Sequence, residues 1–110
     1  MMFFKIKSMI SIKLQNLGTV NKNKITITWF NSWFILYFSY ETIVAIDYYF
    51  EGTGNAKTER VRMVCHNDWS TTTGKLLNEL EPNKKQRVSR ELFDKGLTHL
   101  FDLLQIAISE

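Results

Sequence analysis

Residues 25–39 read ITITWFNSWFILYFS, and this stretch decides the fold. Residues 25–30 alternate apolar and polar side chains, a pattern typical of a β-strand with one apolar face. Residues 31–32 have turn character. Residues 33–39 then form a continuous apolar run, which is consistent with a central strand covered on both faces. The stretch predicts two consecutive strands of an antiparallel sheet.

Similar patterns extend this sheet in both directions along the chain. Residues 42–50 and 60–65 are rich in apolar side chains and β-branched types. A polar loop with two glycines, residues 51–57, separates them. Residues 11–17 alternate as well and predict an earlier strand. We expect an antiparallel meander of four or five strands.

The second half of the chain changes to helical spacing. Residues 73–80 fit a short helix that ends before Pro82, because a residue preceding proline disfavours helical angles. Asn83 has the spacing of a capping box, and from residue 84 onward the apolar side chains recur on one arc of a long helix. Gly96 lies inside this helix, which we expect to bend or break there. Strands first and helices last predict an α+β fold, an antiparallel sheet followed by a short and a long C-terminal helix packed on one face.

Length and composition predict one domain. The chain has 110 residues, of which 45% are hydrophobic and 23% charged, and this is ordinary globular usage. These values exclude disordered, collagen-like and coiled-coil classes. We expect a single domain over residues 1–110, with residues 1–8 as a flexible end.

Several features predict a cytoplasmic protein. A single cysteine cannot form an internal disulfide and suggests a reducing compartment. The longest apolar window, residues 33–50, contains Glu41 and Asp47, so a membrane-spanning helix is not expected. The charged start of the chain lacks the apolar core of a secretory signal. We therefore expect neither a membrane nor secretion.

Charge is unevenly distributed along the chain. The formal net charge is +3. Residues 1–24 hold five lysines and no acid, whereas residues 25–56 hold three acids and no base. Further bases gather in residues 57–66 and 84–95. Such clustering is typical of a nucleic-acid footprint, and the alternative is the solvated surface of a small domain.

Residues for metal or nucleophilic chemistry are few. Cys65, His66 and His99 do not supply the four matched ligands of a structural zinc site. Cys65 and His66 are neighbours in a predicted strand, so their side chains point to opposite faces. We expect a buried thiol beside an exposed imidazole. No paired carboxylates emerge, and the sequence predicts a non-catalytic protein without metal or cofactor.

The most distinctive stretch, residues 67–76, joins the last predicted strand to the first helix. Gly74 and Lys75 resemble the end of a nucleotide-binding P-loop, but Trp69 and Leu76 occupy positions that this motif reserves for glycine and for serine or threonine. The helix start still offers free N–H groups, hydroxyls and Lys75, which predicts an anion site. The alternative is plain capping of the helix.

Two segments resemble an uncharacterised family of small proteins. Residues 38–45 read FSYETIVA and residues 69–78 read WSTTTGKLLN. They are similar to a family, spread through phage, plasmid and bacterial genomes, that pairs an S-Y-x-T-x-x-A strand with a W-S-x-T-T-x-K-H helix start. The resemblance covers about residues 25–80 and implies a mobile-element origin rather than a mechanism. Leu76 stands where this family has histidine, which argues against a histidine-dependent activity.

The leading functional hypothesis is contact with nucleic acid through basic residues at helix starts. Basic side chains would meet phosphates, and Trp69 or aromatics on the sheet would stack on bases. Substituting Lys75 or Arg87 by alanine should then weaken binding and leave thermal stability almost unchanged. The candidate residues are Trp69, Ser70, Thr72, Thr73, Lys75, Lys84, Lys85, Arg87 and Arg90.

The alternative hypothesis is a protein-binding module. Ten of the fifteen aromatic residues lie between Trp29 and Phe50, and the last helix has a wide apolar arc. Apolar surface of this kind marks interfaces with a host protein, as in a phage-encoded inhibitor, or with a second copy of the chain. An enzyme is the third hypothesis and has the least support.

Overall fold

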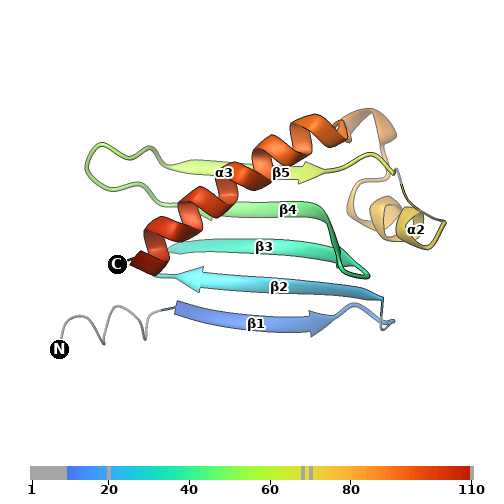
Figure 1. Ribbon diagram of the computed structural model, residues 1–110, viewed down its shortest axis with the longest axis horizontal. Helices are drawn as coiled ribbons and strands as arrows, with labels where there is room; N and C mark the ends of the chain where they lie inside the picture. Colours follow the sequence, from blue (N-terminus) through green and yellow to red (C-terminus); the bar gives the residue numbers. More distant parts are fainter. Residues whose placement is uncertain (1–9, 20, 68, 70, 110) are drawn as a thin grey trace.

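The computed structural model of the protein describes residues 10–19, 21–67, 69 and 71–109. It confirms the predicted α+β fold: a five-stranded antiparallel sheet precedes a short and a long helix (Figure 1). The expectation of a flexible end at residues 1–8 lies outside the described residues.

Each strand of the sheet pairs with the next one along the chain, in the order β1-β2-β3-β4-β5. Two-residue turns join β2 to β3 and β3 to β4. Each turn begins with an aromatic residue of positive φ, Phe30 at 52° and Tyr40 at 57°. The strands are β1 (Ile10–Asn16), β2 (Lys22–Trp29), β3 (Ser32–Ser39), β4 (Thr42–Phe50) and β5 (Glu59–Val64).

The long helix, α3 (Arg90–Ser109), crosses one face of the sheet diagonally (Figure 1). We call this the apolar face. Phe34, Ile46 and Tyr48 are fully buried there against Phe93 and Leu100 of α3. Alternation along the strands directs these side chains to one side, so the burial of one strand face and one helix arc forms the main core.

The short helix, α2 (Thr71–Leu80), packs on the opposite face, at one end of the sheet, so the expectation that both helices pack on one face is wrong. Leu76 and Leu77 are buried against Ala45 and Val64, which are cross-strand partners. The helix starts two residues earlier than the sequence predicts and ends before Pro82 as expected. Among the described residues, no helix covers most of this second face, in contrast to the expectation that β3 is covered on both faces.

The long helix begins later than its apolar periodicity predicts. Asn83 does act as a cap, but of a short 3-10 turn, η1 (Lys84–Gln86), where its Oδ1 accepts from Lys85 N at 3.1 Å. Val88 is then extended beside β5, and its N–H donates to Val64 O at 2.9 Å. Ser89 caps α3, its Oγ accepting from Leu92 N at 3.2 Å. The helical periodicity of the sequence does not reveal that the backbone of Val88 hydrogen-bonds to strand β5.

Helix α3 continues without interruption through Gly96, so the expected break is wrong. A Cβ atom at this position would lie 2.5 Å from Met63 Sδ and 3.7 Å from Ile46 Cδ1. The glycine therefore allows the helix axis to approach the sheet closely, which compensates for its low helix propensity.

Tyr48 and Glu59 link the core to α3 through a polar contact that titrates at high pH. Tyr48 is only 1% exposed, and its hydroxyl donates to Glu59 Oε1 at 3.5 Å, the same oxygen that lies 2.8 Å from His99 Nε2. Burial, together with the charge and hydrogen bond of Glu59, raises the pKa of Tyr48 from 10.0 to about 12. The phenol is therefore harder to ionise in the folded protein.

This pKa shift predicts a loss of stability at alkaline pH. The unfolded chain releases the Tyr48 proton near pH 10 and the folded chain near pH 12. The contribution of the neutral phenol to the free energy of unfolding is therefore complete below pH 10 and is lost as the pH rises to 12. In urea unfolding followed across this interval, Tyr48→Phe should show a shallower decline than the parent. Tyr40→Phe, at an exposed tyrosine, should retain the steeper decline. Parallel profiles for Tyr48→Phe and the parent would contradict this account.

Candidate nucleic-acid interface

Every lysine and arginine of the five described strands lies on the face opposite α3. Directly paired residues in an antiparallel sheet share a face, and the register joins Lys13, Thr26, Ile35, Asp47 and Arg62 in one row across all five strands. We call this side the basic face. Its strand residues include Lys13, Lys22, Lys24, Thr26, Thr28, Trp33, Ile35, Tyr37, Asp47, Tyr49, Arg60 and Arg62.

A second row on the basic face carries aromatic side chains. Trp33 of β3 is the direct partner of Tyr49 of β4, and Tyr49 is the partner of Arg60 in β5. The guanidinium carbon of Arg60 lies 4.9 Å from the centre of the Trp33 ring. Both aromatic residues are partly exposed. They form a platform of two rings and one guanidinium plane, the kind of surface on which nucleobases stack.

Asp47 orients the two arginines of the basic face. Its Oδ1 lies 2.5 Å from Arg60 Nη1 and its Oδ2 lies 4.0 Å from Arg62 Nε. Arg62 also reaches the end of α2, where it donates to Leu80 O and lies 3.8 Å from Glu81 Oε1. Burial and the Asp47 charge raise the pKa of Tyr37, with Arg62 opposing, so this phenol stays neutral at pH 7.

The lysines of the basic face differ in exposure and in whether an acidic side chain pairs with them. Lys22 is buried beneath α2, and its Nζ lies 3.8 Å from Glu79 Oε1. Lys13 is exposed and Lys24 is partly exposed, and neither forms an ion pair with a described acid. Lys13, Lys24 and the two arginines set four cations against the carboxylates of Asp47 and of Glu81, which lies beside Arg62. The basic face therefore has a net positive charge.

Two of the residues predicted from the helix starts are buried and bonded within the protein. Thr73 is 2% exposed, and its Oγ1 lies 2.7 Å from Ser39 Oγ. Arg87 is 7% exposed: its Nε donates to Glu81 O at 3.0 Å and its Nη2 to Asn78 Oδ1 at 2.6 Å. These contacts hold α2 and the following turn together. The expectation that Arg87 serves a partner without affecting stability does not fit this geometry.

Arg90 is exposed but lies over the ring of Trp69. The guanidinium carbon of Arg90 lies 5.2 Å from the centre of the Trp69 ring, and Arg90 Nε lies 3.6 Å from Asp94 Oδ1. Trp69 is partly buried against both hydrophobic clusters. Arg90 covers one side of this ring, as Arg60 does at Trp33, but Trp69 is also packed against the core clusters, so it is a poorer stacking platform than the sequence suggests.

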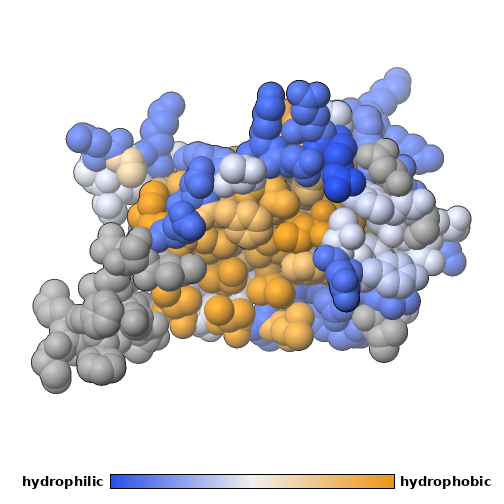
Figure 2. Space-filling model, viewed as in Figure 1, coloured by the Kyte–Doolittle hydropathy of each residue, from blue (hydrophilic) through white to orange (hydrophobic). Residues whose placement is uncertain are grey.

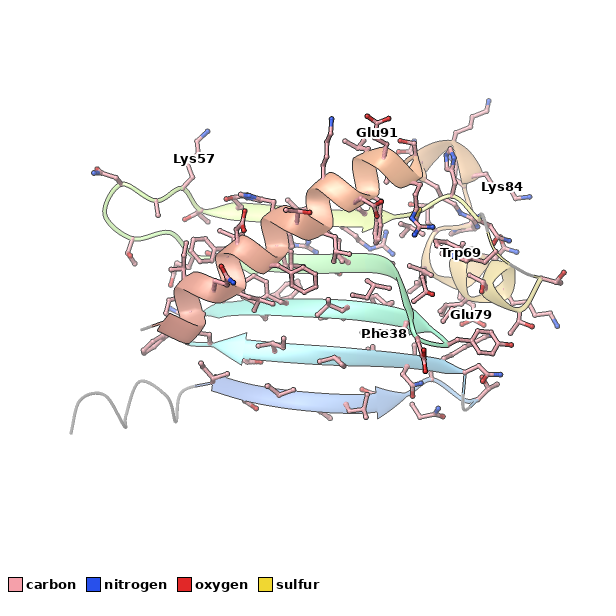
Figure 3. All side chains as sticks on the ribbon, in the orientation of Figure 1. Phe38, Lys57, Trp69, Glu79, Lys84 and Glu91 are labelled. Atoms are coloured by element: carbon pink, nitrogen blue, oxygen red, sulfur yellow. The ribbon has the colours of Figure 1, made fainter. Side chains whose placement is uncertain are left out.

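The remaining predicted residues lie on exposed surface at one end of the molecule. Lys75, Lys84 and Lys85 are exposed and Thr72 is partly exposed, while Ser70 lies outside the described residues. Figure 3 shows Lys84 and Trp69 at this same end. A hollow of about 430 Å³ lies here, lined by His66, Asn67, Asn78, Lys84 and Arg87.

The basic face was missed by reasoning from the sequence, although its signal is present. Lys22 and Lys24 alternate with Asn23 and Ile25, and Arg60 and Arg62 alternate with Val61 and Met63. Each alternation places two cations on one side of its own strand. Only the pairing register of the strands shows that these two sides belong to the same face of the sheet. The sequence of a single strand does not contain that register.

The described residues include neither a candidate metal site nor a candidate membrane-spanning helix. Among them, no group of three His, Cys, Asp or Glu side chains lies close enough to hold a metal ion. Cys65 is buried, and the exposed His66 places its Nε2 3.0 Å from Arg87 O. No helix in this part of the chain is long and apolar enough to cross a membrane.

A protein family described as a family of unknown function (DUF8033) matches residues 5–95, which include all five strands and α2. Neither the curated proteins nor the solved structures give a match to this chain.

Proposed function

The chain belongs to this family of unknown function, DUF8033, and we propose that it binds single-stranded nucleic acid on the basic face. The observation that carries the proposal is the segregation of charge: all strand cations share the face that also presents Trp33 and Tyr49. A face built only for solubility needs no such arrangement of aromatic rings.

The chemistry of the face suits a phosphate backbone with unpaired bases. Lys24 lies on β2, next to the strand that carries Trp33, and Lys13 lies on the edge strand β1, so their ammonium groups would meet phosphates as point charges on the β1 side of the aromatic platform. Trp33 and Tyr49 offer ring faces to bases, and the planar guanidinium of Arg60 extends that platform. Stacking requires bases that are not enclosed in a duplex, so single strands fit better than double helices.

The helix-start cluster is a less well supported surface for the same ligand. Thr73 and Arg87 are buried, and Trp69 is packed against both hydrophobic clusters. Lys75, Lys84 and Lys85 remain as exposed charges without an exposed aromatic platform. We therefore place the nucleic acid on the sheet and treat the three lysines as the competing site in the experiment.

Fluorescence anisotropy with a labelled single-stranded oligonucleotide tests the proposal. The parent should bind at low salt, with an affinity that falls steeply as salt rises. Replacing both Lys13 and Lys24 by glutamine should lower the slope of log affinity against log salt by about 1.4, because each phosphate contact to a single strand contributes about 0.7. Trp33→Ala should weaken binding by about tenfold or more at all salt concentrations, since stacking is worth about 1–3 kcal/mol per base.

Matched variants identify the surface that binds. Lys84→Gln with Lys85→Gln removes the same charge from the helix-start cluster and should change affinity by less than about twofold. Lys95→Gln, on the exposed side of α3, controls for net charge alone. If the Lys84 and Lys85 variant loses binding and the Lys13 and Lys24 variant does not, the nucleic acid binds at the helix starts. Absence of binding at low salt would remove the proposed function.

The proposal also covers the cellular compartment, the domain organisation, the lack of catalysis and the origin of the protein. We place the protein in the cytoplasm as a single non-catalytic domain, a view supported by one buried cysteine, Cys65, and by the lack, among the described residues, of a group of three His, Cys, Asp or Glu side chains that could hold a metal ion. A phage or mobile-element origin is supported by the resemblance of residues 38–45 and 69–78 to such proteins.

A further inference from the structure

Strand β1 exposes apolar side chains at the edge of the sheet. Ile12 and Leu14 are each 69% exposed, and both lie on the apolar face beyond the reach of α3. Figure 2 shows a broad apolar surface between α3 and this edge. The outer side of β1 has no partner strand among the described residues. Long apolar edge strands are templates for pairing with another chain.

The apolar surface continues inward from β1. Ile12 pairs with Ile27 and Leu14 with Ile25, and both β2 residues are only partly buried. A shallow hollow of about 210 Å³ opens beside Leu14, lined also by Asn23, Ile25, Phe38 and Tyr40. The patch is thus contiguous rather than a set of scattered side chains, which is the form that marks an interaction site.

We propose that a second copy of this chain covers the patch, with the two β1 strands paired antiparallel about Ile12. Ile12 then faces Ile12 of the second copy, Ile10 faces Leu14, and Ser11 faces Lys13. All three pairings join side chains of the same face, so apolar residues meet apolar residues on one side of a ten-stranded sheet. The strand is self-complementary in this register.

Charge selects this register over the next one. Pairing centred on Lys13 would also match apolar residues, but it sets Lys13 against Lys13 of the second copy, and like charges directly opposite each other are destabilising. Centring on Ile12 moves each lysine opposite a serine hydroxyl. Lys13 therefore acts as a register-specifying residue at an otherwise apolar edge.

The available area suits a weak to moderate dimer. An apolar patch of this kind measures on the order of a few hundred Å² per copy. Two such patches, with the paired strand backbone added, reach about the 1,000 Å² at which specific interfaces begin. We therefore expect an equilibrium between monomer and dimer that depends on concentration.

This dimer goes beyond the proposed function and shares only Lys13 with it, because it otherwise uses the apolar face and the β1 edge. It would nevertheless place both basic faces on the same side of one continuous sheet and so double the length of the cationic surface. Failure of nucleic-acid binding would leave the dimer untouched, and failure of the dimer would leave a monomer with one basic face.

Sedimentation equilibrium and register-specific cross-linking test the dimer. The parent should show a mass that rises from monomer to dimer with concentration, and Ile12→Lys should remain monomeric. Directly opposed residues of antiparallel strands have Cα atoms about 4.5–5.5 Å apart, within disulfide range. Under mild oxidation Ile12→Cys should therefore form a covalent dimer, whereas Leu14→Cys, which faces Ile10, should not. The native Cys65 is fully buried and does not compete.

Each outcome decides the proposal. A concentration-dependent dimer with selective cross-linking of Ile12→Cys supports it. A parent that stays monomeric at all concentrations overturns it. A dimer that survives Ile12→Lys, or that cross-links through Leu14→Cys, overturns the β1 register.

Discussion

Arg87→Ala should lower the free energy of unfolding by about 2–3 kcal/mol. The substitution removes hydrogen bonds from a charged guanidinium to Glu81 O at 3.0 Å and to Asn78 Oδ1 at 2.6 Å, and it opens space where a 7% exposed side chain lay. Bonds to charged groups are worth about 1.5–3 kcal/mol, and the lost packing of a buried side chain adds to the loss. Urea unfolding followed by tryptophan fluorescence measures the change.

Two variants control this result. Lys85→Ala removes an exposed cation two residues away and should change stability by less than about 0.5 kcal/mol. Arg87→Lys keeps the charge but lacks the planar fork that makes both bonds, so it should recover only part of the loss. If Arg87→Ala were as stable as the parent, Arg87 would be available to a partner, as the sequence alone suggests.

Gly96→Leu is expected to destabilise the protein by up to about 2 kcal/mol. Even a Cβ atom at this position would lie 2.5 Å from Met63 Sδ and 3.1 Å from Met63 Cε, so a longer side chain must displace α3 from the sheet. Overpacking of a close contact typically costs about 1–3 kcal/mol, more than leucine gains over glycine in helix propensity. Thermal and urea unfolding should both report the loss.

A double substitution separates the contact from helix propensity. Gly96→Ala in the parent meets Met63, whereas in a Met63→Ala background the space is free and alanine should stabilise the helix by about 1 kcal/mol. Asp102→Leu, on the exposed side of α3, should be nearly neutral. A stable Gly96→Leu variant would show that α3 does not depend on close approach at this glycine.

The strands were predictable because their signals are local. Alternation in residues 25–30 and the apolar run of residues 33–39 correspond to β2 and β3, and the turn residues between them stand where the chain reverses. The start of α3 was not predictable in this way, since residues 84–88 have helical spacing but Val88 is held extended by its bonds to β5. Tertiary hydrogen bonding overrides local periodicity at that point.

The candidate site was less predictable than the fold, again for a physical reason. Lysines and arginines far apart in the sequence share a face only through the register of four strand pairs. Conversely, Arg87 appears in the sequence as one cation of a basic run, and only the fold shows that it bonds to Asn78 and Glu81. Charge runs along a chain therefore identified a basic protein but not its basic surface.

The two faces of the sheet suggest a division of roles. The apolar face holds the core and, at β1, the surface proposed for a second copy, whereas the basic face carries the cations and the platform of Trp33 and Tyr49. Asp47 lies between the arginines and fixes their orientation. This separation allows self-association and ligand binding to be altered by different substitutions.

The most direct test of nucleic-acid binding on the basic face is a nuclear magnetic resonance titration that follows the three tryptophan indole N–H signals. Trp33 lies on the basic face, Trp69 lies at the helix-start end, and Trp29 lies on the apolar face. Addition of a single-stranded oligonucleotide at low salt should shift the Trp33 signal and leave those of Trp69 and Trp29 in place. A shift of Trp69 with Trp33 unchanged would contradict the proposed interface.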